Sequence, residues 1–142
     1  MEWSHKIETV FTDTLGSEAL VDDDTCRCGG RNTRTKDTVL VRKPQVLVLH
    51  LKRRAFDPVL LRPSKLHTPV SFETVFTLDA HASYDLRSVV VHGGSVGGGH
   101  YTAFVRAQDN FWYFCDDSHA PARCPTRDVL AAEAYMLIYE RR

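Results

Sequence analysis

The chain has no excess of charge of either sign, because 18 basic residues balance 18 acidic ones. Proteins that bind nucleic acid or an anionic membrane surface by electrostatics usually carry a basic excess. Short basic clusters occur at 52–54 and at 141–142, and we interpret both as solvated surface. The composition therefore gives no reason to expect a nucleic-acid or membrane partner.

Long apolar runs are also missing. The longest have the length of a strand, whereas a membrane helix needs about 20 apolar residues. No apolar segment follows a basic start at the N-terminus, so no signal peptide is expected. We therefore expect an intracellular protein, cytoplasmic or nuclear, whose 142 residues form one domain with a core of ordinary size.

Cysteine is scarce, with four residues in the chain. Intracellular thiols stay reduced, so disulfides are not expected. Cys26 and Cys28 are either half of a structural zinc site, which needs four ligands, or part of a simple turn. A reactive thiolate needs a helix N-terminus or a neighbouring cation. Cys115 ends a strand beside two carboxylates and Cys124 lies in a proline-flanked loop, so we interpret both as core or loop residues. The chain thus offers no convincing catalytic thiol.

The sequence is rich in strand signal. Apolar, β-branched segments alternate with turn residues, and the runs at 46–51 and 86–91 are apolar enough to predict fully buried strands, with His50 as a core histidine. Thr126 is a suitable N-cap for a helix over 125–134. Together these patterns predict a strand-rich α+β fold, an antiparallel sheet with one short C-terminal helix. Further strands are expected at 35–41, 70–78, 100–106, 110–115 and 135–139. The segment 54–68 is expected to be a long loop, with a poorly formed edge strand in it as the alternative, and 93–99 a flexible loop.

The pattern with most chemical meaning lies between 93 and 117. His100 follows a glycine-rich segment and starts a strand, and the next strand ends in Asp116 and Asp117. Imidazole titrates near neutral pH and can act as a general base when a carboxylate fixes its tautomer. A hairpin would bring these groups together, so we favour a catalytic base over the alternative, a surface histidine beside a permissive loop. His92 is expected to support the loop by packing.

These residues resemble the C-terminal half of the ubiquitin-specific proteases, the papain-like cysteine deubiquitinases. The resemblance covers about 7–141 in the family's order. It rests on the histidine box YDLRSVVVHGGSVGGGHYTAFVR at 84–106, on Trp112 with the acidic pair that follows it, on PQVLVLHLKR at 44–53, and on AYMLIYER at 134–141. The histidine box is highly specific over this length.

The resemblance implies a role for each matching residue. His100 would be the general base, Asp116 the residue that orients it, and Asp117 a supporting neighbour. Gly98, Gly99 and Tyr101 would contact the C-terminal tail of ubiquitin, and Cys26 and Cys28 would be the second cysteine pair of a zinc ribbon. The expected fold is the antiparallel palm sheet of a papain-like protease, with residues 1–43 as a remnant of the fingers and 44–142 as the palm.

The chain also departs from the family pattern. The cysteine box, which carries the nucleophile on a helical thumb, has no counterpart, and neither has the first cysteine pair of the zinc ribbon. A base without a nucleophile cannot run covalent acyl transfer. We therefore expect the palm of a deubiquitinase that needs no cofactor for catalysis and is inactive alone, with ubiquitin and ubiquitinated proteins as partners. The alternatives are a non-catalytic ubiquitin-binding or scaffold module and a zinc-stabilised interaction domain.

Overall fold

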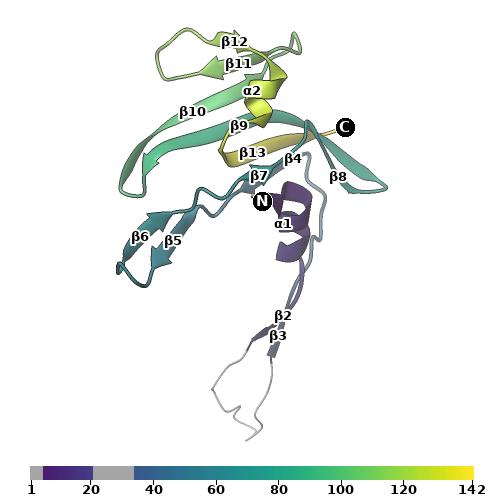
Figure 1. Cartoon of the computed structure of the whole chain (residues 1–142). Helices are drawn as coiled ribbons and strands as arrows, with labels where there is room; N and C mark the ends of the chain where they lie inside the picture. Colours follow the sequence, from purple (N-terminus) through teal and green to yellow (C-terminus); the bar gives the residue numbers. More distant parts are fainter. Residues whose placement is uncertain (1–4, 21–33) are drawn as a thin grey trace, which may run out of the picture.

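A twisted antiparallel sheet organises the molecule (Figure 1). The computed structural model describes residues 5–20 and 34–142. Six strands follow one another across the sheet in the order β12-β11-β10-β9-β13-β4, and a seventh, β8, pairs with the first half of β9. The strands are β4 (Val46–His50), β8 (Val75–Asp79), β9 (Ala82–Ser95), β10 (Gly98–Arg106), β11 (Trp112–Cys115), β12 (Ala122–Cys124) and β13 (Ala134–Arg141).

Three smaller strand pairs surround this sheet. The first is parallel and joins β1 (His5–Lys6) to β7 (Val70–Ser71). The second joins β2 (Gly16–Leu20) to β3 (Arg34–Thr38) and extends away from the main body as an arm (Figure 1). The third is the hairpin of β5 (Arg54–Asp57) and β6 (Arg62–Lys65), which projects in a different direction.

The core lies on one face of the sheet because side chains alternate between faces along each strand. Leu137 and Tyr139 of β13 and Val89 of β9 are fully buried on that face. Helix α1 (Ile7–Thr14) covers one part of it, with Ile7 buried and Phe11 packed edge-on against Phe76. Helix α2 (Thr126–Leu130) covers another part through its buried residue Val129.

The predicted fold class is confirmed, but the helices differ from expectation. Helix α1 was not predicted, because its eight residues hold few apolar positions and depend on tertiary packing. Helix α2 is shorter than predicted and its N-cap is Pro125, with no side-chain capping hydrogen bond from Thr126 or any other residue. Neither of these described helices is long and apolar enough to cross a membrane.

Three further expectations about strands and loops were wrong. The run at 46–51 is not fully buried, because β4 is the last strand of the sheet path and exposes Val46, Val48 and also His50, which is therefore not a core histidine. The segment 54–68 is not a loop, since it contains the β5–β6 hairpin. The glycine-rich segment 93–99 is not a loop either, as β9 continues to Ser95 and pairs with Gly98 at the start of β10.

Candidate active site

His100 lies near the start of β10, where strand pairing fixes its backbone. Its Cα partner across the β9–β10 ladder is Gly93. Strand β11 pairs with the other side of β10, with Cys115 opposite Ala103. The two residues after β11, Asp116 and Asp117, therefore continue alongside the segment that carries His100. The hairpin predicted from the sequence is present and brings the three side chains together.

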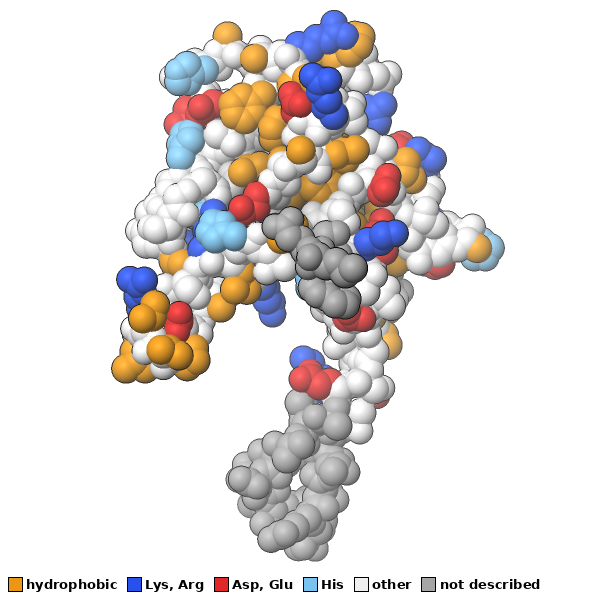
Figure 2. Space-filling model, viewed as in Figure 1, with side chains coloured by type: hydrophobic (Ala, Val, Ile, Leu, Met, Phe, Trp, Pro, Cys, Tyr) orange, Lys and Arg blue, Asp and Glu red, His pale blue; other side chains and the backbone are white. Residues whose placement is uncertain are grey.

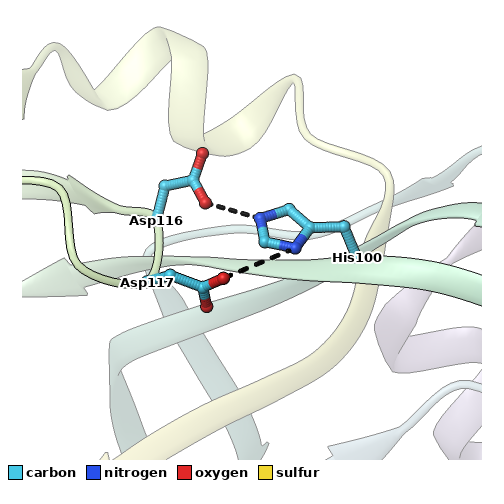
Figure 3. A group of neighbouring side chains, drawn as sticks. All are labelled: His100, Asp116 and Asp117. Atoms are coloured by element: carbon cyan, nitrogen blue, oxygen red, sulfur yellow. Dashed lines mark hydrogen bonds and ion pairs between the residues drawn. The ribbon is translucent and has the colours of Figure 1, made fainter.

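Each nitrogen of the His100 ring faces a different carboxylate (Figure 3). The Nε2 atom lies 2.5 Å from Oδ1 of Asp116, which is a hydrogen bond. The Nδ1 atom lies 3.8 Å from Oδ2 of Asp117, which is too long for one. A carboxylate accepts and cannot donate, so Asp116 selects the tautomer with hydrogen on Nε2 and leaves the lone pair of Nδ1 free to accept a proton.

The carboxylates also change the acidity of the ring. The hydrogen bond and the negative charge of Asp116, with a smaller contribution from Asp117, raise the pKa of His100 above its ordinary value of 6.5. The His100 side chain is about half exposed, so it remains accessible to a reacting group. The loop that holds the carboxylates is itself tied back, because Nδ1–H of His119 donates to the backbone carbonyl of Asp116 at 3.0 Å.

The glycines before His100 allow two strands and a histidine ring to come unusually close. A Cβ atom on Gly99 would collide with the backbone carbonyl oxygen of Gly93 and with Nε2 of His92. Gly94 has a φ of +97°, in the left-handed region that favours glycine. Gly98, in contrast, has open space around the position of a Cβ. The segment is therefore a tightly built hairpin.

His92 is buried beneath this hairpin and packs against two tyrosines. Its ring lies 4.6 Å from the ring of Tyr101 and 5.7 Å from that of Tyr135, measured between centroids. The backbone carbonyl of His92 accepts a hydrogen bond from Nζ of Lys65 at 2.5 Å. This packing agrees with the expectation that His92 supports the glycine-rich segment. The side chain of Tyr101 beside it is about half exposed.

Arg53 holds the β5–β6 hairpin next to the site. It was expected on a solvated face, but it is buried. Its Nε donates to the carbonyl of Ala134 at 2.7 Å, and its Nη1 donates to the carbonyls of Leu66 and Thr68 at 3.1 and 2.9 Å. Burial lowers the pKa of the guanidinium, an effect that nearby Glu133 partly offsets. No local pattern separates Arg53 from its exposed neighbours Lys52 and Arg54.

The His100 ring forms its hydrogen bond with Asp116, and no hydrogen bond joins it to a cysteine of the described segments. Cys124, in strand β12 and not in a loop as expected, packs against the core, and its burial raises the pKa of its thiol, followed by smaller effects of Asp128 and Cys115. Cys115 is partly buried at the end of β11. Cys26 and Cys28 lie outside the described residues, so their expected zinc site is untested.

A metal ion is a poor match for the His100 cluster. The ligand atoms of His100, Asp116 and Asp117 lie within 4.8 Å of one another. An ion bound to all three would have to replace the proton between Nε2 and Asp116, and the two carboxylates flank opposite nitrogens of the ring. The arrangement suits a hydrogen-bonded base better than a metal centre.

The sequence of the chain matches that of a known protein family. The sequence model described as Ubiquitin carboxyl-terminal hydrolase matches residues 6–139. Ubiquitin carboxyl-terminal hydrolase 2 of Homo sapiens is 38% identical over 124 residues, which cover 81% of this chain and 20% of the relative. Ubiquitin carboxyl-terminal hydrolase nonstop of Drosophila melanogaster is 35% identical over 135 residues, covering 89% of this chain and 27% of the relative.

Solved structures give the same result. A chain of the yeast SAGA DUB module superposes with a TM-score of 0.85 at 27% identity, covering 97% of this chain and 33% of that chain. A chain of the SAGA DUB module of Ubp8, Sgf11, Sus1 and Sgf73 bound to monoubiquitin superposes with a TM-score of 0.84 at the same identity. This chain thus spans a third or less of the length of each of these proteins.

Proposed function

The chain belongs to the ubiquitin carboxyl-terminal hydrolase family, and from this membership we propose that it supplies the general base of a thiol-dependent deubiquitinase. The observation that supports the proposal is the hydrogen bond between Nε2 of His100 and Asp116, which leaves Nδ1 free to accept a proton. His100 would be the catalytic base and Asp116 the residue that orients it. Asp117 would add negative charge near Nδ1 and favour the imidazolium.

In the proposed reaction, Nδ1 takes the proton of a cysteine thiol supplied by a segment outside this chain. The thiolate attacks the carbonyl carbon of the last residue of ubiquitin, and the imidazolium returns its proton to the leaving amine. Water, deprotonated by the same nitrogen, then attacks the thioester carbonyl, and the C–S bond breaks. Ubiquitin leaves with a free C-terminal carboxyl group, and the imidazolium returns its proton to the cysteine sulfur. The raised pKa of His100 favours the imidazolium that forms when the thiol ionises.

We place the tail of ubiquitin beside the glycine hairpin. A cleft of about 590 Å³ lies between the β5–β6 and β9–β10 hairpins, and Gly94 and Gly97 line one wall while Arg62 and Lys65 line the other. Gly98, Gly99 and Tyr101 would contact the tail as it runs towards His100. Figure 2 shows apolar side chains gathered at the tip of the β5–β6 hairpin, where Val59 and neighbouring residues are exposed.

A chimera tests the catalytic assignment. Residues 6–139 of this chain would replace the matching segment of human ubiquitin carboxyl-terminal hydrolase 2, which keeps its own preceding segment. We expect the chimera to hydrolyse a ubiquitin–fluorophore conjugate and the His100→Ala chimera to be slower by at least about 10²-fold. His50→Ala, an exposed histidine on β4, is the matched control and should retain activity. Equal rates for the His100→Ala and parent chimeras would refute the assignment.

A second candidate function is non-catalytic binding of ubiquitin. The exposed apolar residues at the tip of the β5–β6 hairpin, Val59, Leu60 and Leu61, favour it, because such a patch can contact a protein partner without a catalytic thiol. If this function holds, ubiquitin binds the isolated chain with an affinity that His100→Ala leaves unchanged, and the chimera described above is inactive. Titration of labelled ubiquitin with both forms of the chain measures the binding, and the activity of the chimera distinguishes the two functions.

The remaining assignments follow from the family resemblance. We propose that residues 1–43 belong to the fingers and 44–142 to the palm, and that Cys26 and Cys28 contribute to a structural zinc site. Measuring the zinc content of the purified chain, and of its Cys26→Ser variant, tests the second assignment. Absence of stoichiometric zinc in the parent chain would leave the pair as a simple turn.

A further inference from the structure

Strand β4 leaves one edge of the main sheet open. It is the last strand of the sheet path and pairs with β13 on one side, and no other strand of the described segments pairs with its other side. An open edge presents unpaired N–H and C=O groups, which natural proteins usually cover, charge or interrupt. β4 is neither charged nor interrupted, because its sequence VLVLH contains no lysine, acid or proline.

The register identifies which peptide groups point outwards. Arg141 N–H donates to the carbonyl of Gln45, and Leu51 N–H donates to the carbonyl of Tyr135. Hydrogen-bonded and non-hydrogen-bonded pairs alternate along an antiparallel ladder, and this ladder has no register shift. The odd-numbered residues of β4 therefore bond to β13, while the peptide groups of Val46, Val48 and His50 face away from it.

The same residues expose apolar side chains. Val46 is 51% exposed and Val48 is 48% exposed, whereas Leu47 between them is 7% exposed and lies in the core. The edge thus combines free backbone groups with two β-branched side chains two residues apart on one face. An incoming strand could form hydrogen bonds with these backbone groups and pack against the two valine side chains.

The charges around the edge are positive. Arg42 lies before β4, and Lys52 and Arg54 lie after it, and all three are exposed. No acidic residue in the described part of the chain forms an ion pair with any of them, whereas Lys43 is paired with Asp79. A second copy of this chain would bring like charges to both ends of the joint strand, which disfavours self-pairing.

We propose that β4 is a docking edge for an extended segment of another protein, one that alternates apolar residues and carries acidic residues at its ends. The segment adds a strand beside β4, bonds to the peptide groups of Val46, Val48 and His50, and places its acids near Arg42 and Lys52. The proposal is independent of the proposed function, since it involves neither His100 nor the ubiquitin cleft.

A synthetic peptide tests the proposal on the intact chain. The probe has valine alternating with threonine between two acidic ends, and the control peptide has the same core between lysine ends. We expect the acidic probe to bind about tenfold or more tightly than the control, as a few exposed charge pairs would give. On binding, hydrogen exchange of the Val46, Val48 and His50 amides should slow, while the amides of Leu47 and Leu49 are already protected by β13.

Three variants separate docking from unspecific attraction. Val48→Pro removes one outward N–H without removing a bond to β13, and it should weaken binding about tenfold, whereas Val48→Thr should not. The double variant Lys52→Glu with Arg54→Glu should bind the lysine-ended peptide in preference to the acidic one. The proposal would be overturned if neither peptide bound or if both bound with equal affinity. It would also be overturned if self-association at rising chain concentration protected the same amides without any peptide.

Discussion

At the scale of single residues, the proposed chemistry depends on the pair of His100 and Asp116, and the titration of His100 is measurable without catalysis. Asp116 raises the pKa of His100 by a hydrogen bond and by its charge. We expect Asp116→Asn to lower the pKa of His100 towards its ordinary value of 6.5, as followed by the ring proton shifts in NMR. An unchanged pKa in the variant would show that the hydrogen bond does not form in solution.

The same pair gives stability a defined pH dependence. Because the folded-state pKa of His100 is raised, the stabilising effect of Asp116 is present in full below the unfolded-state pKa of about 6.5 and is lost as the pH rises through the folded-state value. The free energy of unfolding of Asp116→Asn should therefore approach that of the parent chain at high pH. Chemical denaturation at several pH values measures the difference, and a gap that widens with pH would contradict the assignment.

At the scale of the elements, the β9–β10 hairpin makes a matched comparison of two adjacent glycines possible. Gly99→Ala should destabilise the fold by about 1–3 kcal/mol, because its Cβ meets the carbonyl of Gly93 and the ring of His92. Gly98→Ala should change the free energy of unfolding by no more than about 0.5 kcal/mol, since nothing lies near its Cβ. Urea denaturation of the two variants tests this, and equal effects would mean that the hairpin is looser than described.

The attachment of the β5–β6 hairpin depends on one buried side chain. Arg53→Met should destabilise the chain by about 3 kcal/mol, because three backbone carbonyls lose their donor away from water. Arg54→Met, on the exposed neighbour, should cost no more than about 0.5 kcal/mol. Thermal or urea unfolding of both variants measures the contrast, and a neutral Arg53→Met would show that these carbonyls find other donors.

For the whole molecule, the prediction concerns activity without an added partner. A ubiquitin probe with a thiol-reactive C-terminus should give no adduct with this polypeptide, since the pKa of the partly buried Cys124 thiol is raised and Cys115 forms no hydrogen bond with His100 in the described residues. Intact mass spectrometry detects an adduct directly. An adduct that disappears in Cys115→Ser or Cys124→Ser would identify a nucleophile within the chain and would replace the proposed mechanism.

The sequence by itself determined the fold class, most strand positions and the grouping of His100 with the acidic pair. These features depend on local information: alternation of apolar residues marks strands, and a short hairpin fixes which residues become neighbours. The histidine box also indicated the family of the chain, and the comparisons confirm it. Strand ends were less well predicted, and β9 continues beyond the expected Leu86–Val91 at both of its ends.

Only the tertiary structure decided the environment of each element. The apolar run of β4 suggested a buried strand, yet its place at the end of the sheet exposes Val46, Val48 and His50. Arg53 is buried while Lys52 and Arg54 are exposed, because acceptors from distant segments meet at one position. Strand order and burial arise from contacts between residues far apart in the chain, and no local pattern encodes them.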